Sequence, residues 1–543
     1  MGGRSAVQGA QALYSGRVTV VLAGVLHAVS TAWPFDFGFS RGQTSWLLQL
    51  AAMALLGWVL LRARNAREAF AAGWCFGTAA LASTFWWLFV AMHTYGGLAA
   101  PLAVLAVLLL AALLALYFGA ACGLWWRLTQ RHSAQAALLF GVLWMMGEMA
   151  RGTWLTGFGW GAGGYAHLDG PLAFYAPWVG VYGITGLAAG LSLGAAQMVA
   201  ALAGVRPVAD ISARVRARAG LLGLEPQSSP RFTWGVMALL IALPLAAPTR
   251  WNDWTHSSGS LSVTLLQGNI AQNEKFEVGT GVARALVWYQ TELLGARTAL
   301  VVAPETALPV LPQQLPEGYW ESLRAAMDAT GRAAVIGIPL GEETQGYSNS
   351  VLGLVGGVGR VLRYDKHHLV PFGEFIPPFF RWFTALMHIP LGDFNRGGLG
   401  QASFAVQGQR LAPNICYEDL FGEELAARFM DDALAPTIFV NVSNLGWFGD
   451  TVAMDQHLAI SRMRALEFQR PFVRATNTGA TAILDHQGQV SASLARLKAG
   501  ALVGEVQGRE GITPFARWAA RFGLWPLWLL GSAVVVWARR GRA

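Results

Sequence analysis

Three polar residues of complementary chemistry follow short apolar stretches in the second half of the chain. Glu305 lies in the phrase VVAPET, Lys366 in RYDKHH and Cys416 in NICYED. A thiol must lose its proton before it attacks a carbonyl carbon, and a nearby carboxylate suits the role of base. A nearby ammonium lowers the pKa of the thiol and can hydrogen-bond the oxyanion of a tetrahedral intermediate. These residue types therefore indicate a cysteine nucleophile with a base and an oxyanion donor.

Each of the three residues also has a plainer interpretation. A Glu or Lys at a strand end is most often a solvated charge. The chain has three cysteines, too few for a disulfide scaffold, and Cys75 and Cys122 lie in long apolar stretches where they act as small apolar residues. Cys416 has no cysteine partner in its part of the chain. Taken alone, it is either a nucleophile or a buried inert thiol.

The elements that carry these residues are those of an α/β domain over residues 248–516. Its apolar runs are short and are bounded by Gly, Pro, Asn and Asp, which is typical of strands in a soluble domain. The pattern predicts strands at 261–266, 299–303, 334–338, 350–355, 359–364, 411–416, 437–442, 472–476, 481–485 and 501–506. It predicts helices at 280–294, 319–329, 423–431 and 451–469.

The rest of the chain has the composition of a membrane protein. Hydrophobic residues make up 54% and charged residues only 13% of the 543 residues, against about 25% charged in an ordinary soluble domain. A purely soluble protein is therefore excluded. The net charge of +8 comes from short Arg clusters beside apolar segments, which indicates membrane topology and not nucleic-acid binding.

Eight apolar stretches approach the ~20 residues that a membrane span needs. They are residues 18–34, 45–61, 70–92, 98–126, 136–150, 177–204, 232–247 and 522–537. The first also resembles a signal peptide. The Arg clusters alternate so that both termini are expected in the cytoplasm. The predicted domains are a membrane domain with seven helices at 1–247, an external domain at 248–516, and a final helix with a basic tail at 517–543.

The order of Glu305, Lys366 and Cys416, each at a strand end, resembles the nitrilase superfamily over about residues 261–506. Members share an α-β-β-α sandwich and a Glu-Lys-Cys triad. Together with the eight spans, the phrases HLVPFGEFIP, ICYE and SNLGWFG make the whole chain similar to the bacterial apolipoprotein N-acyltransferase family. The chain departs from that family at Leu445 and Gly446, where an acidic and a small residue are usual.

The resemblance implies a multi-pass enzyme of the bacterial inner membrane whose catalytic domain lies on the periplasmic side. It implies transfer of an acyl chain from a phospholipid, typically phosphatidylethanolamine, through a cysteine thioester to the α-amino group of diacylglyceryl apolipoproteins. It implies no cofactor, no metal and no nucleic acid. The implied roles are general base for Glu305, oxyanion stabiliser for Lys366, nucleophile for Cys416 and supporting roles for Glu374, Tyr417 and Glu418.

Further residues are candidates for substrate binding. The family uses a Trp shortly before the first strand, and either Trp251 or Trp254 can be that residue. Residues 377–390 are too short to span a bilayer and form either an interfacial arm or a loop packed on its own domain. The candidates, including the aromatics of this stretch and of the SNLGWFG phrase, are Trp251, Trp254, Phe379, Phe380, Trp382, Asn444, Trp447 and Phe448.

Two rival functions are compatible with parts of the pattern. A membrane-tethered nitrilase-like amidase shares the acylation step but uses water to resolve the thioester. A non-catalytic scaffold on the same fold has no need for all three triad residues. The eight spans and the aromatic stretch favour transfer to a lipid-anchored amine.

Overall fold

The computed structural model describes residues 2–129, 134–204, 252–342, 344–377 and 393–540, with isolated positions between 235 and 246. The chain divides into two compact units. The helical unit comprises Met1–Trp86, Leu105–Trp251 and Leu524–Ala543. The sheet unit comprises Trp87–Val104 and Asn252–Gly523. The short segment 87–104 therefore belongs with the sheets, although it lies far from them in sequence.

The helical unit is a bundle of apolar helices. They are α1 (Gly2–Thr31), α2 (Trp46–Arg62), α3 (Ala66–Phe85), α4 (Ala100–Leu114, from Leu105 on), α5 (Leu116–Leu128), α6 (Ala134–Thr153), α7 (Ala176–Leu202) and α16 (Trp525–Arg540). Helix α3 packs between α1 and α5, α6 packs between α5 and α7, and α2 packs against both α1 and α7.

Two helical segments of the described residues, Ala100–Leu128 and Pro171–Leu202, are long and apolar enough to cross a membrane. A third is added if the bent pair α15 (Pro514–Phe522) and α16 counts as one span. The expected number of eight spans stays a prediction. Half of the apolar stretch 232–247 lies outside the described residues.

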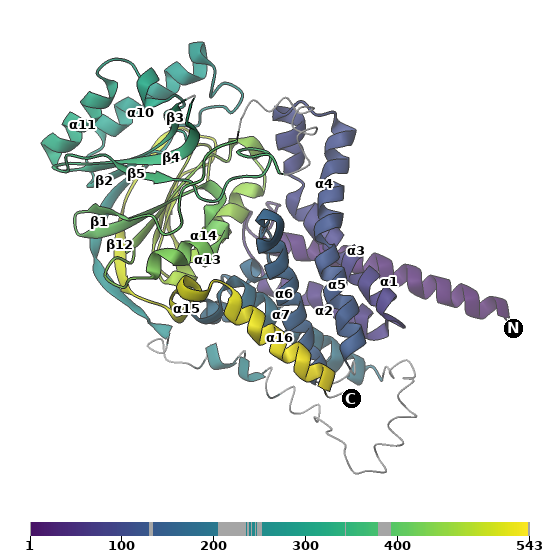
Figure 1. Cartoon of the computed structure of the whole chain (residues 1–543). Coiled ribbons are helices and arrows are strands. Elements are labelled where there is room, and N and C mark those ends of the chain that lie inside the picture. The colour runs from purple at the N-terminus through teal and green to yellow at the C-terminus, as the bar shows by residue number, and fades with distance from the viewer. Residues whose placement is uncertain are drawn as a thin grey trace. The chain divides into compact units, whose positions relative to one another are not determined.

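The sheet unit contains two six-stranded sheets (Figure 1). The first has the order β12-β1-β2-β3-β4-β5 and the second β11-β10-β9-β8-β7-β6. The strands of the first are β1 (Thr255–Gln267), β2 (Leu300–Val302), β3 (Ala333–Glu342), β4 (Gly346–Val355), β5 (Leu362–Asp365) and β12 (Gly500–Gly511). Those of the second are β6 (Phe404–Val406), β7 (Gln409–Ile415), β8 (Ile438–Ser443), β9 (Phe472–Thr476), β10 (Ala482–Leu484) and β11 (Val490–Ser493).

Alternation of side chains along the strands builds the layers. In β2, Leu300 and Val302 belong to the core between the two sheets, whereas Val301 belongs to the core beneath the helices of the first sheet. Both faces of this strand are buried, which explains its uninterrupted apolar sequence.

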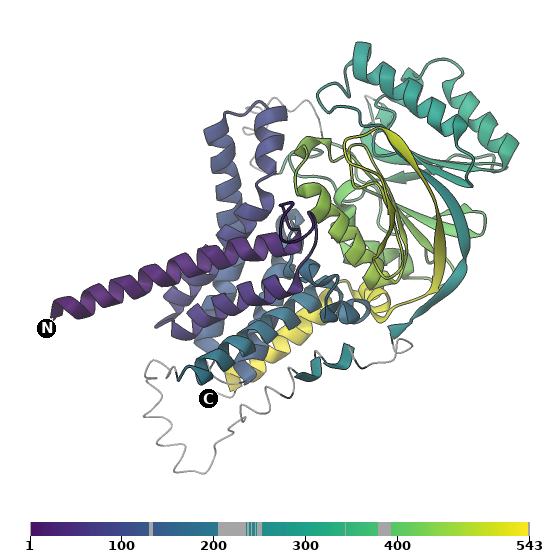
Figure 2. The same ribbon diagram turned by 180° about the vertical axis from the view of Figure 1, so that it is seen from behind.

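Helices cover the outer face of each sheet (Figure 2). Helices α10 (Ala283–Gly295) and α11 (Tyr319–Thr330) pack on the first sheet, and α13 (Gly422–Ala426), α14 (Ala453–Phe468) and α15 on the second. The resulting order is helix, sheet, sheet, helix. This is the α-β-β-α sandwich that the sequence predicts.

Strand direction brings the polar strand ends to one edge of the sandwich. In the first sheet β1, β2 and β3 are parallel, and β5 runs in the same direction because β4 is antiparallel to both of its neighbours. In the second sheet β7, β8 and β9 are parallel. Glu305, Lys366 and Cys416 follow the carboxyl ends of β2, β5 and β7 respectively. Parallel strands present such ends along a common edge.

The turn that carries Glu305 crosses β3 at a point where only glycine fits. A Cβ atom built on Gly337 would lie 2.2 Å from Pro304 O and 2.7 Å from Glu305 Cα, both main-chain atoms that cannot rotate away. The main chain beyond Glu305 also bonds to this position, since Leu308 N donates to Gly337 O at 3.2 Å. Gly337 therefore sets how closely the Glu305 turn approaches the sheet.

We expect Gly337→Ala to displace this turn and to destabilise the sheet unit by about 1–3 kcal/mol, the usual cost of overpacking. The measurement is the thermal unfolding temperature of the detergent-solubilised protein. Gly359→Ala is the matched control, because a Cβ atom there meets open space. Equal unfolding temperatures for the two variants would contradict the conclusion that the Glu305 turn requires glycine at position 337.

Candidate active site

The ammonium of Lys366 lies between two carboxylates. Its Nζ donates to Glu374 Oε1 at 2.9 Å and lies 3.4 Å from Glu305 Oε1. The Lys366 side chain is fully buried, and the two carboxylates are nearly so. Asn349 on β4 completes the arrangement, because its Nδ2 donates at 2.7 Å to both carboxylates. The predicted supporting residue Glu374 is thus in direct contact with the predicted triad.

The two carboxylates keep Lys366 charged. Burial by itself acts to lower the pKa of this ammonium, but Glu374 and Glu305 outweigh burial and raise the pKa well above its ordinary value. A buried charge needs such pairing, since an unpaired one costs several kcal/mol of lost hydration. Lys366 therefore offers a permanent positive charge beside Glu305.

Cys416 occupies a strained turn. It is the first residue after β7 and begins the short helix η8 (Cys416–Leu420), and its φ of 55° lies in the left-handed region that non-glycine residues rarely adopt. Asn441 on β8 holds the turn by donating from Nδ2 to Cys416 O at 2.9 Å. The side chain keeps some exposure, while the neighbours Ile415 and Tyr417 are buried. Cys416 therefore keeps part of its surface accessible at a sharp turn between a strand and a helix.

The thiol is protonated in the resting site. Its burial, followed by the negative charge of Glu305, raises the pKa of Cys416 well above the ordinary value, and Lys366 only partly opposes this. Attack on a carbonyl carbon therefore requires a base that takes the Sγ proton. Of the two carboxylates that contact Lys366, Glu305 has the larger effect on the pKa of Cys416.

Glu418 fastens the two strand ends that carry Lys366 and Cys416. Its Oε1 accepts from the backbone N–H groups of His367 at 2.6 Å and His368 at 3.1 Å. Its Oε2 accepts from Ile415 N at 2.6 Å and from the hydroxyl of Tyr364 at 2.8 Å. One carboxylate therefore links the end of β5 in one sheet to the end of β7 in the other.

A second buried ion pair lies beneath the turn that carries Cys416. Asp419 accepts from Arg474 on β9 at 3.0 Å, and both side chains are fully buried. Burial raises the pKa of Asp419 to about 6, although Arg474 acts in the opposite direction. This pair ties η8 to β9 and so fixes the helix that Cys416 begins.

The SNLGWFG loop after β8 also reaches the site. The backbone N–H of Asn444 donates to Glu305 Oε2 at 2.8 Å, and Asn444 Nδ2 donates to Gln272 Oε1 at 2.7 Å. Trp447 and Phe448 follow in the short helix η10 (Gly446–Phe448). The predicted pocket-wall residue Asn444 therefore contacts the proposed base directly.

Trp447 and Phe448 pack against the distant segment 87–104. Their rings meet Tyr95 at 5.9 Å and Trp87 at 4.4 Å between centroids, and Trp87 Nε1 donates to Gln456 Oε1 at 2.9 Å. The sequence did not anticipate this contact. It places aromatic side chains beside the loop that holds Asn444.

The structure does not bring every predicted residue together. Trp254 precedes β1, whereas the site lies beyond the other end of the parallel strands, so Trp254 stands at the opposite end of the first sheet. Tyr417 does belong to the cluster, since Lys366 Nζ lies 5.9 Å from its ring centre. Trp251, Phe379, Phe380 and Trp382 lie outside the described residues.

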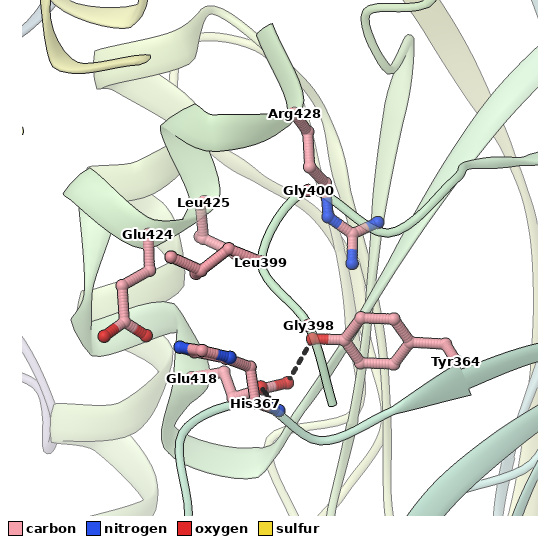
Figure 3. Close-up of a pocket in the computed structure, with 9 residues that line it drawn as sticks. All are labelled: Tyr364, His367, Gly398, Leu399, Gly400, Glu418, Glu424, Leu425 and Arg428. Atoms are coloured by element: carbon pink, nitrogen blue, oxygen red, sulfur yellow. Dashed lines mark hydrogen bonds between the residues drawn. The ribbon is translucent and has the colours of Figure 1, made fainter. Parts of the chain in front are cut away.

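A small cavity lies behind Glu418 (Figure 3). It measures about 20 Å³, which is room for about one water molecule. Its lining includes Tyr364, His367, Glu418 and Arg428 but none of the triad residues. The cavity is therefore not the place where a substrate meets the thiol.

Sequence reasoning missed two contacts of Glu305. Asn349 is a buried amide between two buried serines of β4, Ser348 and Ser350. Lys275 is a buried lysine whose Nζ donates to Glu305 O at 3.1 Å. Asn349 lies just before the strand that the sequence predicts at 350–355, and its polarity does not distinguish it from the serines on either side. Nothing in the local pattern marked Lys275, because its burial depends on the turn that surrounds it.

The arrangement can carry out nucleophilic acyl transfer. It combines a cysteine at a strand-to-helix turn, a carboxylate positioned by Asn349 and Asn444, and an ammonium that stays charged. These are the parts that a thioester mechanism needs.

Comparison with known proteins agrees with this geometry. Residues 24–194 match the family "Apolipoprotein N-acyltransferase N-terminal domain", and residues 262–513 match "Carbon-nitrogen hydrolase". Apolipoprotein N-acyltransferase of Verminephrobacter eiseniae is 56% identical over 96% of both chains. The enzyme of the same name from Ralstonia nicotianae is 43% identical over 96% of this chain and 93% of its own length. The chain therefore belongs to the apolipoprotein N-acyltransferase family.

Proposed function

We propose that the protein transfers an acyl chain from a membrane phospholipid, through a thioester on Cys416, to the α-amino group of the N-terminal diacylglyceryl-cysteine of apolipoproteins. Full-length similarity to proteins named for this activity supports the proposal. The single observation that carries the chemistry is the contact of Lys366 with two carboxylates beside the thiol turn. This arrangement supplies a base and an oxyanion donor together.

In the first half-reaction Glu305 takes the proton from Cys416 Sγ, and the thiolate attacks the ester carbonyl of the phospholipid. Lys366 has three N–H groups, two of which face Glu305 and Glu374, and the third faces the developing oxyanion. Collapse of the tetrahedral intermediate breaks the ester C–O bond. Glu305 then returns the proton to the leaving alkoxide, which departs as a lysophospholipid.

In the second half-reaction the α-amine of the apolipoprotein attacks the thioester carbonyl. Glu305 takes one proton from the attacking nitrogen, and the C–S bond breaks. The proton passes to the departing sulfur, so that the thiol is restored and an amide is formed. The same base and the same oxyanion donor therefore serve both steps.

Membrane placement completes the proposal. Both substrates are lipids, so the thiol must be reached without the acyl chains crossing water. We place the catalytic domain on the periplasmic face of the inner membrane, with eight spans and phosphatidylethanolamine as donor. The alternating Arg clusters support this orientation. The interfacial arm at 377–390 stays a prediction on sequence grounds.

Cys416→Ala should abolish both the acyl-enzyme and lipoprotein N-acylation, because no other group can form the thioester. The measurement is intact mass after incubation with phospholipid, followed by hydroxylamine, which removes a thioester-linked acyl group. Cys75→Ala is the matched control, since Cys75 lies in α3 of the helical unit. An alanine variant that still acylates a diacylglyceryl peptide would refute the nucleophile assignment. Release of free fatty acid in place of an acylated peptide would instead indicate an amidase-like hydrolase.

Glu305→Gln should slow alkylation of Cys416 by iodoacetamide, because the amide cannot accept the thiol proton. The substitution preserves shape and keeps an oxygen to accept from Asn349 or Asn444, so the domain should remain folded. The rate is followed by mass at the Cys416 peptide. Glu317→Gln, at an exposed position, is the control. Unchanged alkylation kinetics in Glu305→Gln would remove this residue from the role of base.

The orientation is tested with reporter fusions. A reporter active only outside the cytoplasm should work when it is fused after residue 247 and should fail when it is fused after residue 540. The Arg clusters beside the spans are the physical reason. The reverse pattern would place the catalytic domain in the cytoplasm and would overturn the proposed topology.

A further inference from the structure

The chain contains only three lysines, and two of them are fully buried next to Glu305. Lys366 contacts the carboxylate of Glu305, and Lys275 contacts its backbone carbonyl. Lys498, the third lysine, is exposed. The remaining cations are arginines, which cannot lose their proton in a protein. The two cations that contact Glu305 are therefore both lysines, and they differ in their partners.

Lys275 reaches Glu305 from a turn that the mechanism does not otherwise use. The turn follows β1 and contains Gln272 and Lys275. Lys275 Nζ donates to Glu305 O at 3.1 Å, while Gln272 Oε1 accepts from Asn444, whose own N–H binds Glu305 Oε2. Glu305 is thus held from two sides by the same turn. The residue that follows it, Thr306, has a φ of 50°, so its backbone is strained and needs such support.

The turn itself has little freedom. A Cβ atom on Gly281 would lie 2.0 Å from Glu274 O and 3.0 Å from Lys275 N, so the chain packs tightly against the backbone of Lys275. The neighbouring Glu274 points elsewhere and pairs with Arg284 at 2.6 Å in an exposed position. The negative charges that act on Lys275 are those of Glu305 and, once the thiol has lost its proton, of Cys416.

We propose that Lys275 is a positioning residue of the acyl-transfer site, which holds the Glu305 turn and supplies a second positive charge that favours the Cys416 thiolate. The inference rests on the proposed roles of Glu305 and Cys416. It adds a cation on the backbone side of Glu305, opposite to the contact with Lys366.

The two lysines differ in how firmly they keep their charge. Lys366 contacts two carboxylates, which hold its pKa high despite its burial. Among the described residues Lys275 Nζ has a hydrogen bond to a carbonyl oxygen, that of Glu305, and burial lowers its pKa to about 8 against the opposing effects of Glu305 and Cys416. Its positive charge is therefore present below about pH 8 and is lost above it. The attraction between this charge and the thiolate is reciprocal, so its loss raises the pKa of the thiol.

The test is the pH dependence of iodoacetamide alkylation at Cys416 in the full-length protein, followed by peptide mass between pH 6.5 and 9.5. We expect Lys275→Met to react about tenfold more slowly than the wild type at pH 7, equivalent to a thiol pKa about one unit higher. The defect should shrink above pH 8, where the wild-type lysine is itself neutral. Lys275→Arg should retain the wild-type rate at pH 7 and exceed it at pH 9. Lys498→Met is the matched control.

The wild-type protein gives an independent readout that needs no folded variant. Its alkylation rate should rise with pH, flatten near pH 8 as Lys275 loses its charge, and rise again. A defect in Lys275→Met that is the same at every pH, or a wild-type profile without the flattening, would overturn the inference. If Glu305→Gln slows alkylation and Lys275→Met does not, only the role of Lys275 fails. If neither variant slows it, the proposed base fails as well.

Discussion

A buried ammonium costs several kcal/mol of hydration unless carboxylates and hydrogen bonds replace the water that it loses. At this site Glu305 and Glu374 provide that replacement for Lys366, and Asn349 donates to both of them so that their charges coexist. Removing any member leaves a buried charge or a buried amide without its partner. The elements that carry these residues are therefore constrained together, and the position of the base relative to Cys416 follows from that constraint.

The fold holds these buried polar groups together through the direction of its strands and through two strained turns. Parallel strands deliver polar residues to one edge of both sheets, and Glu418 then fastens the end of β5 to the end of β7 across the sandwich. Thr306 and Cys416 both adopt positive φ values directly at these strand ends. Such strain persists only where the surroundings determine the backbone. Here the surroundings include the Asn441 side chain, which donates to Cys416 O, and the backbone N–H of Asn444, which donates to the carboxylate of Glu305.

Acyl transfer makes two opposing demands on the thiol. It must stay protonated until the ester arrives and must then lose its proton readily, and later it must leave again from the thioester. Burial and Glu305 satisfy the first demand by raising the pKa of Cys416. Nearby cations satisfy the second demand, because a positive charge such as that of Lys366 stabilises the thiolate. The site thus meets both demands with fixed charges around one sulfur atom, and the helical unit supplies apolar helices of the length that a lipid environment requires.

The sequence alone determined those features that a local pattern of residues encodes, namely the strands and the polar residues at their ends. Short apolar runs predicted the strands, and the polar residues that end three of them predicted the triad, because strand identity and strand ends are read within a few residues. The sequence did not predict the partly exposed strands β6 and β11, because their apolar patterns are short and weak. Only the tertiary structure decided which distant groups surround Glu305 and Asn444. Trp87 and Gln456 are 369 residues apart, and Lys275 is buried only because other elements close over its turn. Long-range packing creates such neighbours, and no local periodicity records it.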